Sequence, residues 1–184
     1  MNVLTFRFEV SLGSNDHEVR PMIDGKDVLN KDFLGLDPPE YFNQPKLFES
    51  GDILIGRCKC GVVGCDDIRI KNTISSKEVT WNLKGGKKYI FSKKEYFESI
   101  NHSSNDSSWE NNERKAERLV SYIDFSTLAE YGYEFNWASA RISKGCISLS
   151  FEKDNTQRIF DIGWNPEDPD DAVRNVTRWV IEYV

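Results

Sequence analysis

Histidine is scarce in this sequence, and the short motifs that mark common nucleotide-binding and hydrolytic sites are missing. The 184 residues include two histidines, His17 and His102, both in segments expected to be polar turns or loops. There is no G-x-x-x-x-G-K-[ST], G-x-S-x-G or H-E-x-x-H motif, and no G-x-G-x-x-G follows a predicted strand. Few groups remain that titrate near neutral pH, so the sequence predicts no catalytic residue and no cofactor, with zinc as the alternative.

Long apolar runs and an excess of positive charge are also lacking. No uncharged apolar run approaches the ~18 residues that a membrane-spanning helix needs, and residues 1–10 alternate like a strand instead of resembling a signal peptide. We therefore expect a cytoplasmic protein without membrane contact, whose four cysteines are reduced thiols or metal ligands. Lys and Arg number 24 against 30 Asp and Glu, and the resulting net charge of −6 argues against nucleic-acid binding.

Aromatic residues, by contrast, are plentiful. The 5 Trp, 7 Tyr and 11 Phe suffice for a hydrophobic core. Alternation of apolar and polar residues predicts strands: Leu4, Phe6 and Phe8 share one face, with Thr5 and Arg7 on the other. The predicted strands are 3–10, 19–23, 52–58, 66–71, 78–83, 88–91, 133–142, 146–151 and 157–164.

Capping residues predict the helices. Asp37 followed by two prolines begins a short helix, and S-x-x-E boxes at Ser92 and Ser107 begin two more, separated by a polar loop over 101–108. Asp168 followed by Pro169 begins a C-terminal helix. Tight turns between strands and helices grouped in blocks predict an α+β fold in one domain over residues 1–184. In it, helices pack on a mainly antiparallel sheet built from hairpins.

The segment R-C-K-C-G-V-V-G-C at 57–65 is the most unusual part of the chain. If 61–64 form a four-residue loop in which Gly61 and Gly64 supply positive φ, Cys60 faces Cys65 and Cys58 faces Asp67. Three thiols and one carboxylate then share a face of the hairpin. The same register pairs Ile55 with Ile70 on the opposite, buried face, together with Ile53 and Ile68.

Three interpretations of these thiols compete. A zinc site would use Cys58, Cys60 and Cys65, but tetrahedral zinc prefers four Cys or His ligands, and Cys146 is the only remaining thiol. A redox site would need a thiolate of low pKa, favoured by Arg57 or Lys59. In the third interpretation the small thiols only pack around a tight glycine turn.

The hairpin resembles the R-C-x-C-G-x-x-G-C hairpin of a set of uncharacterised bacterial proteins. V-T-W at 79–81, Y-I-F-S at 89–92 and Tyr96 extend the similarity over residues 51–100. A Trp that is frequent after the last cysteine in that set is missing here, where Asp66 and Asp67 follow. The resemblance implies no activity and therefore no catalytic residue.

Other charged and aromatic residues suggest contacts with partners. Lys84, Lys87 and Lys88 surround a glycine turn, close to two further lysines at 93–94, and form either a solvated hairpin tip or a patch for an anionic ligand or partner. Trp109 begins a polar helical turn and is a candidate exposed anchor for a partner. Asp161, Glu134 and Glu152 offer a possible carboxylate pair, although such residues are common on solvated strands.

These observations favour a non-catalytic protein-interaction function. An acidic inhibitor associates readily with a basic surface, so an immunity-type protein that binds a toxin domain fits the charge and the lack of a catalytic constellation. A zinc or thiol site at the cysteine hairpin is the second expectation, and an enzyme with an unrecognised site is the third.

Overall fold

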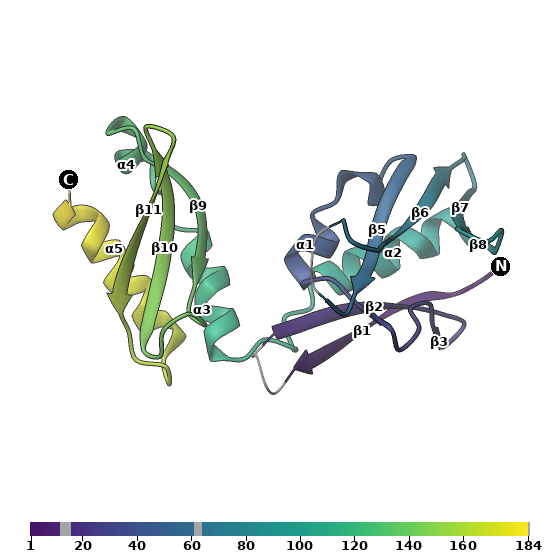
Figure 1. Ribbon diagram of the computed structural model, residues 1–184, viewed down its shortest axis with the longest axis horizontal. Coiled ribbons are helices and arrows are strands. Elements are labelled where there is room, and N and C mark those ends of the chain that lie inside the picture. The colour runs from purple at the N-terminus through teal and green to yellow at the C-terminus, as the bar shows by residue number, and fades with distance from the viewer. Residues whose placement is uncertain (12–15, 61–63, 184) are drawn as a thin grey trace. The chain divides into compact units, whose positions relative to one another are not determined.

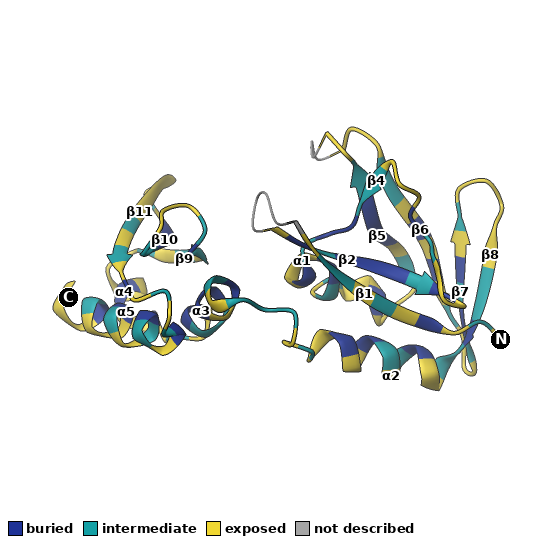
Figure 2. Cartoon of the chain, turned by 90° about the horizontal axis from the view of Figure 1, so that it is seen from below, coloured by how far each residue is buried: buried dark blue, intermediate teal, exposed yellow. Residues whose placement is uncertain are grey.

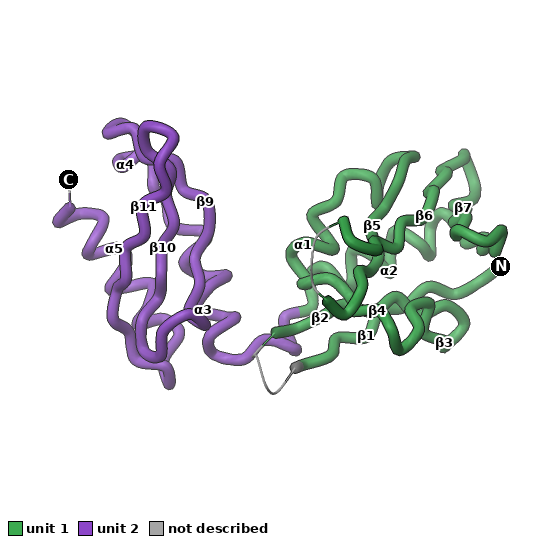
Figure 3. The backbone as a smooth tube through the Cα atoms, in the orientation of Figure 1, with its two compact units in different colours: residues 1–106 green, residues 107–184 purple. Residues whose placement is uncertain are grey.

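The chain forms two compact units, Met1–Asp106 and Ser107–Val184 (Figure 3). The computed structural model describes residues 1–11, 16–60 and 64–183 (Figure 1). Each unit has its own cluster of buried apolar residues. The single domain expected from the sequence stays a prediction, and the units are described one at a time.

Two antiparallel sheets build the first unit. Strands β1, β2 and β3 form one sheet, and strands β4 to β8 form the other in sequence order. An isolated bridge joins Val19 of β2 to Leu36, two residues after β4, and Val19 N donates to Leu36 O at 2.7 Å. The elements are β1 (Leu4–Ser11), β2 (Asp16–Ile23), β3 (Lys26–Asp27), β4 (Phe33–Leu34), α1 (Pro38–Phe42), the 3-10 helix η1 (Pro45–Leu47), β5 (Gly51–Cys58), β6 (Asp67–Ile74), β7 (Glu78–Leu83), β8 (Lys88–Ser92) and α2 (Lys93–Ser104).

The core of the first unit is rich in aromatic rings. Trp81 of β7 contacts Phe91 of β8 and Tyr96 of α2 edge-on, at centroid distances of 5.3 and 5.9 Å. Alternate residues of β7 face inward, as the sequence pattern predicts, and Tyr96 and Ile100 lie on the buried side of α2 (Figure 2). Each such ring can bury roughly 150–250 Å², and aliphatic side chains make up the rest of this core.

The N-terminal segment covers the edge of β8. Asn2 N donates to Ile90 O at 2.7 Å, and Ile90 N donates back to Asn2 Oδ1 at 2.9 Å. Ser99 Oγ of α2 donates to Leu4 O at 2.7 Å. Asn2 therefore satisfies backbone groups of a strand edge that would otherwise be open to pairing with other chains.

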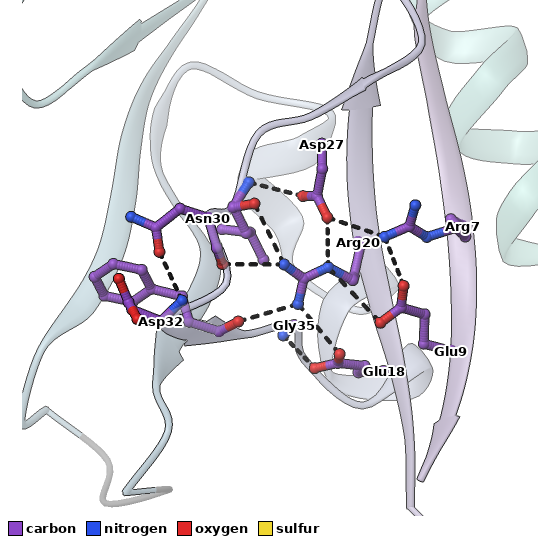
Figure 4. Close-up of polar contacts among 10 residues, drawn as sticks. Arg7, Glu9, Glu18, Arg20, Asp27, Asn30, Asp32 and Gly35 are labelled. Atoms are coloured by element: carbon purple, nitrogen blue, oxygen red, sulfur yellow. Dashed lines mark hydrogen bonds and ion pairs between the residues drawn. The ribbon is translucent and has the colours of Figure 1, made fainter.

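A buried arginine organises the loop between β3 and β4 (Figure 4). Arg20 of β2 is 6% exposed, and its Nε donates to Asp27 at 2.7 Å. Its two terminal nitrogens donate to Glu18 and to the carbonyls of Leu29, Asn30 and Phe33. Burial by itself lowers the pKa of Arg20, but its contacts with Asp27 and Glu18 outweigh this and raise it.

The second unit is a three-stranded antiparallel sheet in the order β11-β10-β9. Helices α3 and α5 lie on one face of it (Figure 2). Ile147, Leu149 and Phe151 of β10 are fully buried and belong to one core cluster with Val120 of α3 and Val176 of α5. The elements are α3 (Asn112–Ser121), α4 (Ser126–Glu130), β9 (Glu134–Ser139), β10 (Cys146–Lys153), β11 (Thr156–Gly163) and α5 (Pro169–Tyr183).

A buried glutamate joins α3 to the end of β9 in the second unit. Glu117 is 7% exposed, and its Oε1 accepts hydrogen bonds from Ala140 N at 2.9 Å, Arg141 Nε at 2.9 Å and Ser139 Oγ at 3.1 Å. Its Oε2 accepts from Arg114 Nη1, also buried, at 3.1 Å. The carboxylate thus accepts hydrogen bonds from two arginines, one hydroxyl and one backbone N–H.

The structure confirms the α+β class and the antiparallel pairing of the strands. It also confirms the C-terminal helix, which begins at Pro169, and Asp170 N donates to Asp168 Oδ1 at 3.2 Å. The helix expected from Ser107 instead begins at Asn112, because the Asn111 side chain accepts from Arg114 N and caps it. The loop expected over 101–108 is also partly wrong, since α2 continues to Ser104.

Candidate metal centre

The β5–β6 hairpin carries three of the four cysteines. Cys58 is the last residue of β5, and its N–H donates to Asp66 O at 3.1 Å. Cys60 and Cys65 follow in the turn, where Gly64 has φ of +79°. This confirms the positive φ predicted for Gly64, while Gly61 lies outside the described residues.

The thiol groups of the turn are close together. The Sγ atoms of Cys58, Cys60 and Cys65 all lie within 4.8 Å of one another. Cys58 Sγ and Cys60 Sγ are 2.6 Å apart and share a hydrogen bond. Sulfurs at two corners of a tetrahedron around zinc, each ~2.3 Å from the ion, would be about 3.8 Å apart. The three thiols are therefore near enough to ligate one ion after small side-chain rotations.

The thiols are accessible, and none of the four cysteines forms a disulfide. Cys60 and Cys65 are exposed and Cys58 is half-buried. Hydrogen bonds with Cys60 and Cys58 raise the pKa of the Cys65 thiol to about 11. A redox nucleophile instead needs a depressed pKa. Arg57, which the redox interpretation invoked, pairs with Glu40 of α1, so its charge is already compensated.

The hairpin register differs from the predicted one. Ile53, not Ile55, pairs with Ile70, and Arg57, not Cys58, pairs with Asp67. The register shifts between Leu54 and Gly56, so Ile55 sits in an irregularity of β5. Cys60 and Cys65 consequently lie in the turn beyond the ladder. The predicted burial of Ile55 and Ile70 is confirmed.

The carboxylate of Asp67 supports the turn and does not join the thiols. Its Oδ1 accepts from Gly64 N at 3.3 Å, and its Oδ2 pairs with Arg69 at 3.2 Å. These contacts fix the backbone beside Cys65. Asp67 is therefore a turn-stabilising residue in this structure.

Comparison with known proteins does not identify the chain. No family model, no curated protein and no solved structure matches it. The chemistry of the site therefore rests on its own residues. The cluster of Cys58, Cys60 and Cys65 is the part of the sequence resemblance that the structure supports.

The remaining predicted site residues lie apart from this cluster. Cys146 begins β10 in the second unit and is half-buried. Lys84, Lys87 and Lys88 are exposed around the β7–β8 turn, where Lys87 Nζ lies 5.0 Å from the centre of the Tyr89 ring. Their role as a patch for a partner stays a prediction.

Trp109 is half-buried instead of fully exposed, because the Arg114 guanidinium lies 5.3 Å from its ring centre. The indole therefore packs on its own unit, a contact of the cation–π type. A partner could reach only the remaining exposed part of the ring. Its role as an anchor stays a prediction.

The structure corrects the setting of both histidines. His17 lies in β2, pairs with Val10 and is 3% exposed, because the β1–β2 ladder continues beyond the predicted strand. His102 is exposed but belongs to α2. Neither lies in a polar turn or loop.

The sequence offers a possible carboxylate pair among three acidic residues, and these residues lie in two different environments. Glu134 and Glu152 are exposed cross-strand neighbours on β9 and β10. Asp161 accepts a hydrogen bond from Ser148 Oγ at 2.5 Å. An acid–base role for the pair stays a prediction.

Proposed function

We propose that Cys58, Cys60 and Cys65 bind one soft metal ion as thiolates, with zinc as the first ion to test. The observation that carries the proposal is the grouping of all three sulfurs within 4.8 Å. The hairpin supplies these ligands within eight consecutive residues, so no distant part of the fold has to move to form the site.

Thiolate sulfur is the donor that zinc and copper(I) accept most readily in proteins. Binding would replace the thiol protons and the sulfur hydrogen bonds with metal–sulfur bonds, and would fix the turn between β5 and β6. Positive charge is already nearby, because Lys59 is exposed between two of the cysteines. This cation reduces the repulsion among three thiolates.

The direct test is the metal content of the purified chain. We expect about one equivalent of zinc after purification with a phosphine reductant and without added metal, measured by plasma mass spectrometry. Cys58→Ser and Cys65→Ser should each lower this to about a tenth or less. Cys146→Ser is the matched control and should retain full occupancy. No metal in the wild-type chain, and none taken up on adding stoichiometric zinc, would refute the proposal.

A second candidate is the protein-interaction function, which the distribution of charge favours. Residues 107–184 contain 9 Lys and Arg against 14 Asp and Glu, whereas residues 1–106 contain 15 against 16. The second unit thus carries nearly all of the net negative charge and suits a basic partner. If a toxin domain is encoded beside this gene, titration with it at two salt concentrations tests the idea, and binding that is absent or independent of salt would count against it.

A further inference from the structure

We infer that the metal site is open and that the thiolate of a free small-molecule thiol occupies its fourth coordination position. This inference rests on the proposed function and specifies the ligand class of the same site. A tetrahedral ion held by three protein thiolates keeps one position for an external donor. The sulfur cluster at 58–65 has the ligand count of such an open site.

Among the described residues of the first unit, no fourth His, Cys, Asp or Glu side chain joins the group of three sulfurs. Every His, Cys, Asp and Glu of the sequence lies among the described residues. Of those in residues 1–106, only the three hairpin thiols group within 4.8 Å. The two carboxylate oxygens of Asp67 are engaged by Gly64 N and Arg69. His17 is buried in β2, so its imidazole is not presented at the surface.

Access and charge both favour a small external thiolate. Cys60 and Cys65 are exposed, so an external sulfur can approach the ion from the solvent side. A soft ion already bound to three thiolates prefers a fourth sulfur to a water oxygen. Four thiolates around a divalent ion leave two negative charges, which the exposed Lys59 would partly offset. The incoming thiol releases its proton to solvent as its sulfur binds.

Cobalt(II) provides a spectroscopic test, because its sulfur charge-transfer absorption reports how many thiolates are bound. The full chain is loaded with one equivalent of Co²⁺ in a phosphine reductant and titrated with 2-mercaptoethanol. We expect saturable growth of the charge-transfer band by about one third, the change from three to four thiolates. Ethylene glycol, in which a hydroxyl replaces the thiol, should change nothing.

The outcomes separate this inference from the proposed function. Failure of Co²⁺ and Zn²⁺ to bind removes the metal site itself. Binding with no response to the thiol, or X-ray absorption showing four sulfurs before thiol is added, overturns the open position alone. Cys146→Ser should give the wild-type titration, and a lost response in this variant would also overturn it. Loading with metal should leave the sedimentation coefficient unchanged, because a metal-bridged dimer would mean that a second copy supplies the sulfur.

Discussion

Each unit of the chain places a buried charged side chain against an irregular segment, and these two side chains have opposite signs. In residues 1–106, Arg20 donates to the carbonyls of Leu29, Asn30 and Phe33. In residues 107–184, Glu117 accepts from Ala140 N and from two arginines. The irregular segment explains the difference in sign. The loop before β4 turns carbonyls inward and needs a donor, whereas the end of β9 turns an N–H inward and needs an acceptor.

Removing the buried anion should have the largest effect. Glu117→Ala leaves Arg114 buried without its carboxylate, and we expect a loss of about 3–5 kcal/mol in the stability of the second unit. Amide NMR spectra during urea unfolding should show residues 107–184 unfolding early while residues 1–106 keep their native signals. Glu130→Gln, at an exposed position of α4, is the control and should change little. Equal destabilisation of both units would contradict the view that each network serves only its own unit.

Removing the buried cation should have the next largest effect. Arg20→Met leaves three carbonyls and two carboxylates short of donors, and we expect a loss of about 3 kcal/mol confined to residues 1–106. Arg20→Lys should cost less, because it retains the charge but can donate fewer hydrogen bonds. Arg7→Met is the control: Arg7 also pairs with Asp27, but its side chain is 47% exposed, so its loss should cost at most about 1 kcal/mol. A larger cost for Arg7→Met than for Arg20→Met would refute this ranking.

Metal should also distinguish the two units. If zinc binds the three hairpin thiols, zinc at 100 times its dissociation constant should stabilise residues 1–106 by about 2.7 kcal/mol. Residues 107–184 should unfold at an unchanged urea concentration. Unfolding curves with zinc and with the chelator EDTA measure both effects in one sample. Stabilisation that persists in Cys65→Ser would show that zinc acts elsewhere.

The smallest effect should come from the exposed cap of α5. A hydrogen bond from Arg174 lowers the pKa of Asp168, so the folded state favours the ionised carboxyl. Its stabilisation is present above the ordinary Asp range near pH 4 and is lost as the pH falls through the lowered pKa. Asp168→Asn should therefore slightly lower the melting temperature of the second unit at pH 7, and the difference should vanish in acid. A constant difference from pH 7 to pH 2 would contradict a charge effect.

Local sequence signals predicted the features that depend on neighbouring residues. The Asp168–Pro169 cap placed the start of α5, and the spacing of Cys58, Cys60 and Cys65 placed three thiols together. Both follow from residues only a few positions apart. A side chain and a backbone group within one turn meet whatever the rest of the fold does.

Features that depend on tertiary contacts were not predicted. Residues 53–55 read Ile-Leu-Ile, so either register buries apolar side chains, and the pattern could not reveal the irregularity at Ile55. Glu117 follows Ala116 on the buried side of α3, a position that could have signalled a buried charge. Its partners Ala140 and Arg141 are 23 and 24 residues away, beyond the reach of a local pattern.

The two hydrogen bonds between Asn2 and Ile90 constrain the order in which the first unit can fold. The two residues are 88 positions apart, and Ser99 reaches Leu4 over 95. At translation rates of roughly 5–20 residues per second, Ile90 is synthesised about 4 to 18 s after Asn2. During that interval β1 can pair with β2, but the far edge of the growing five-stranded sheet has no cover. The contacts of Asn2 and Leu4 with Ile90 and Ser99 can therefore form only after residues 90–99 have been synthesised.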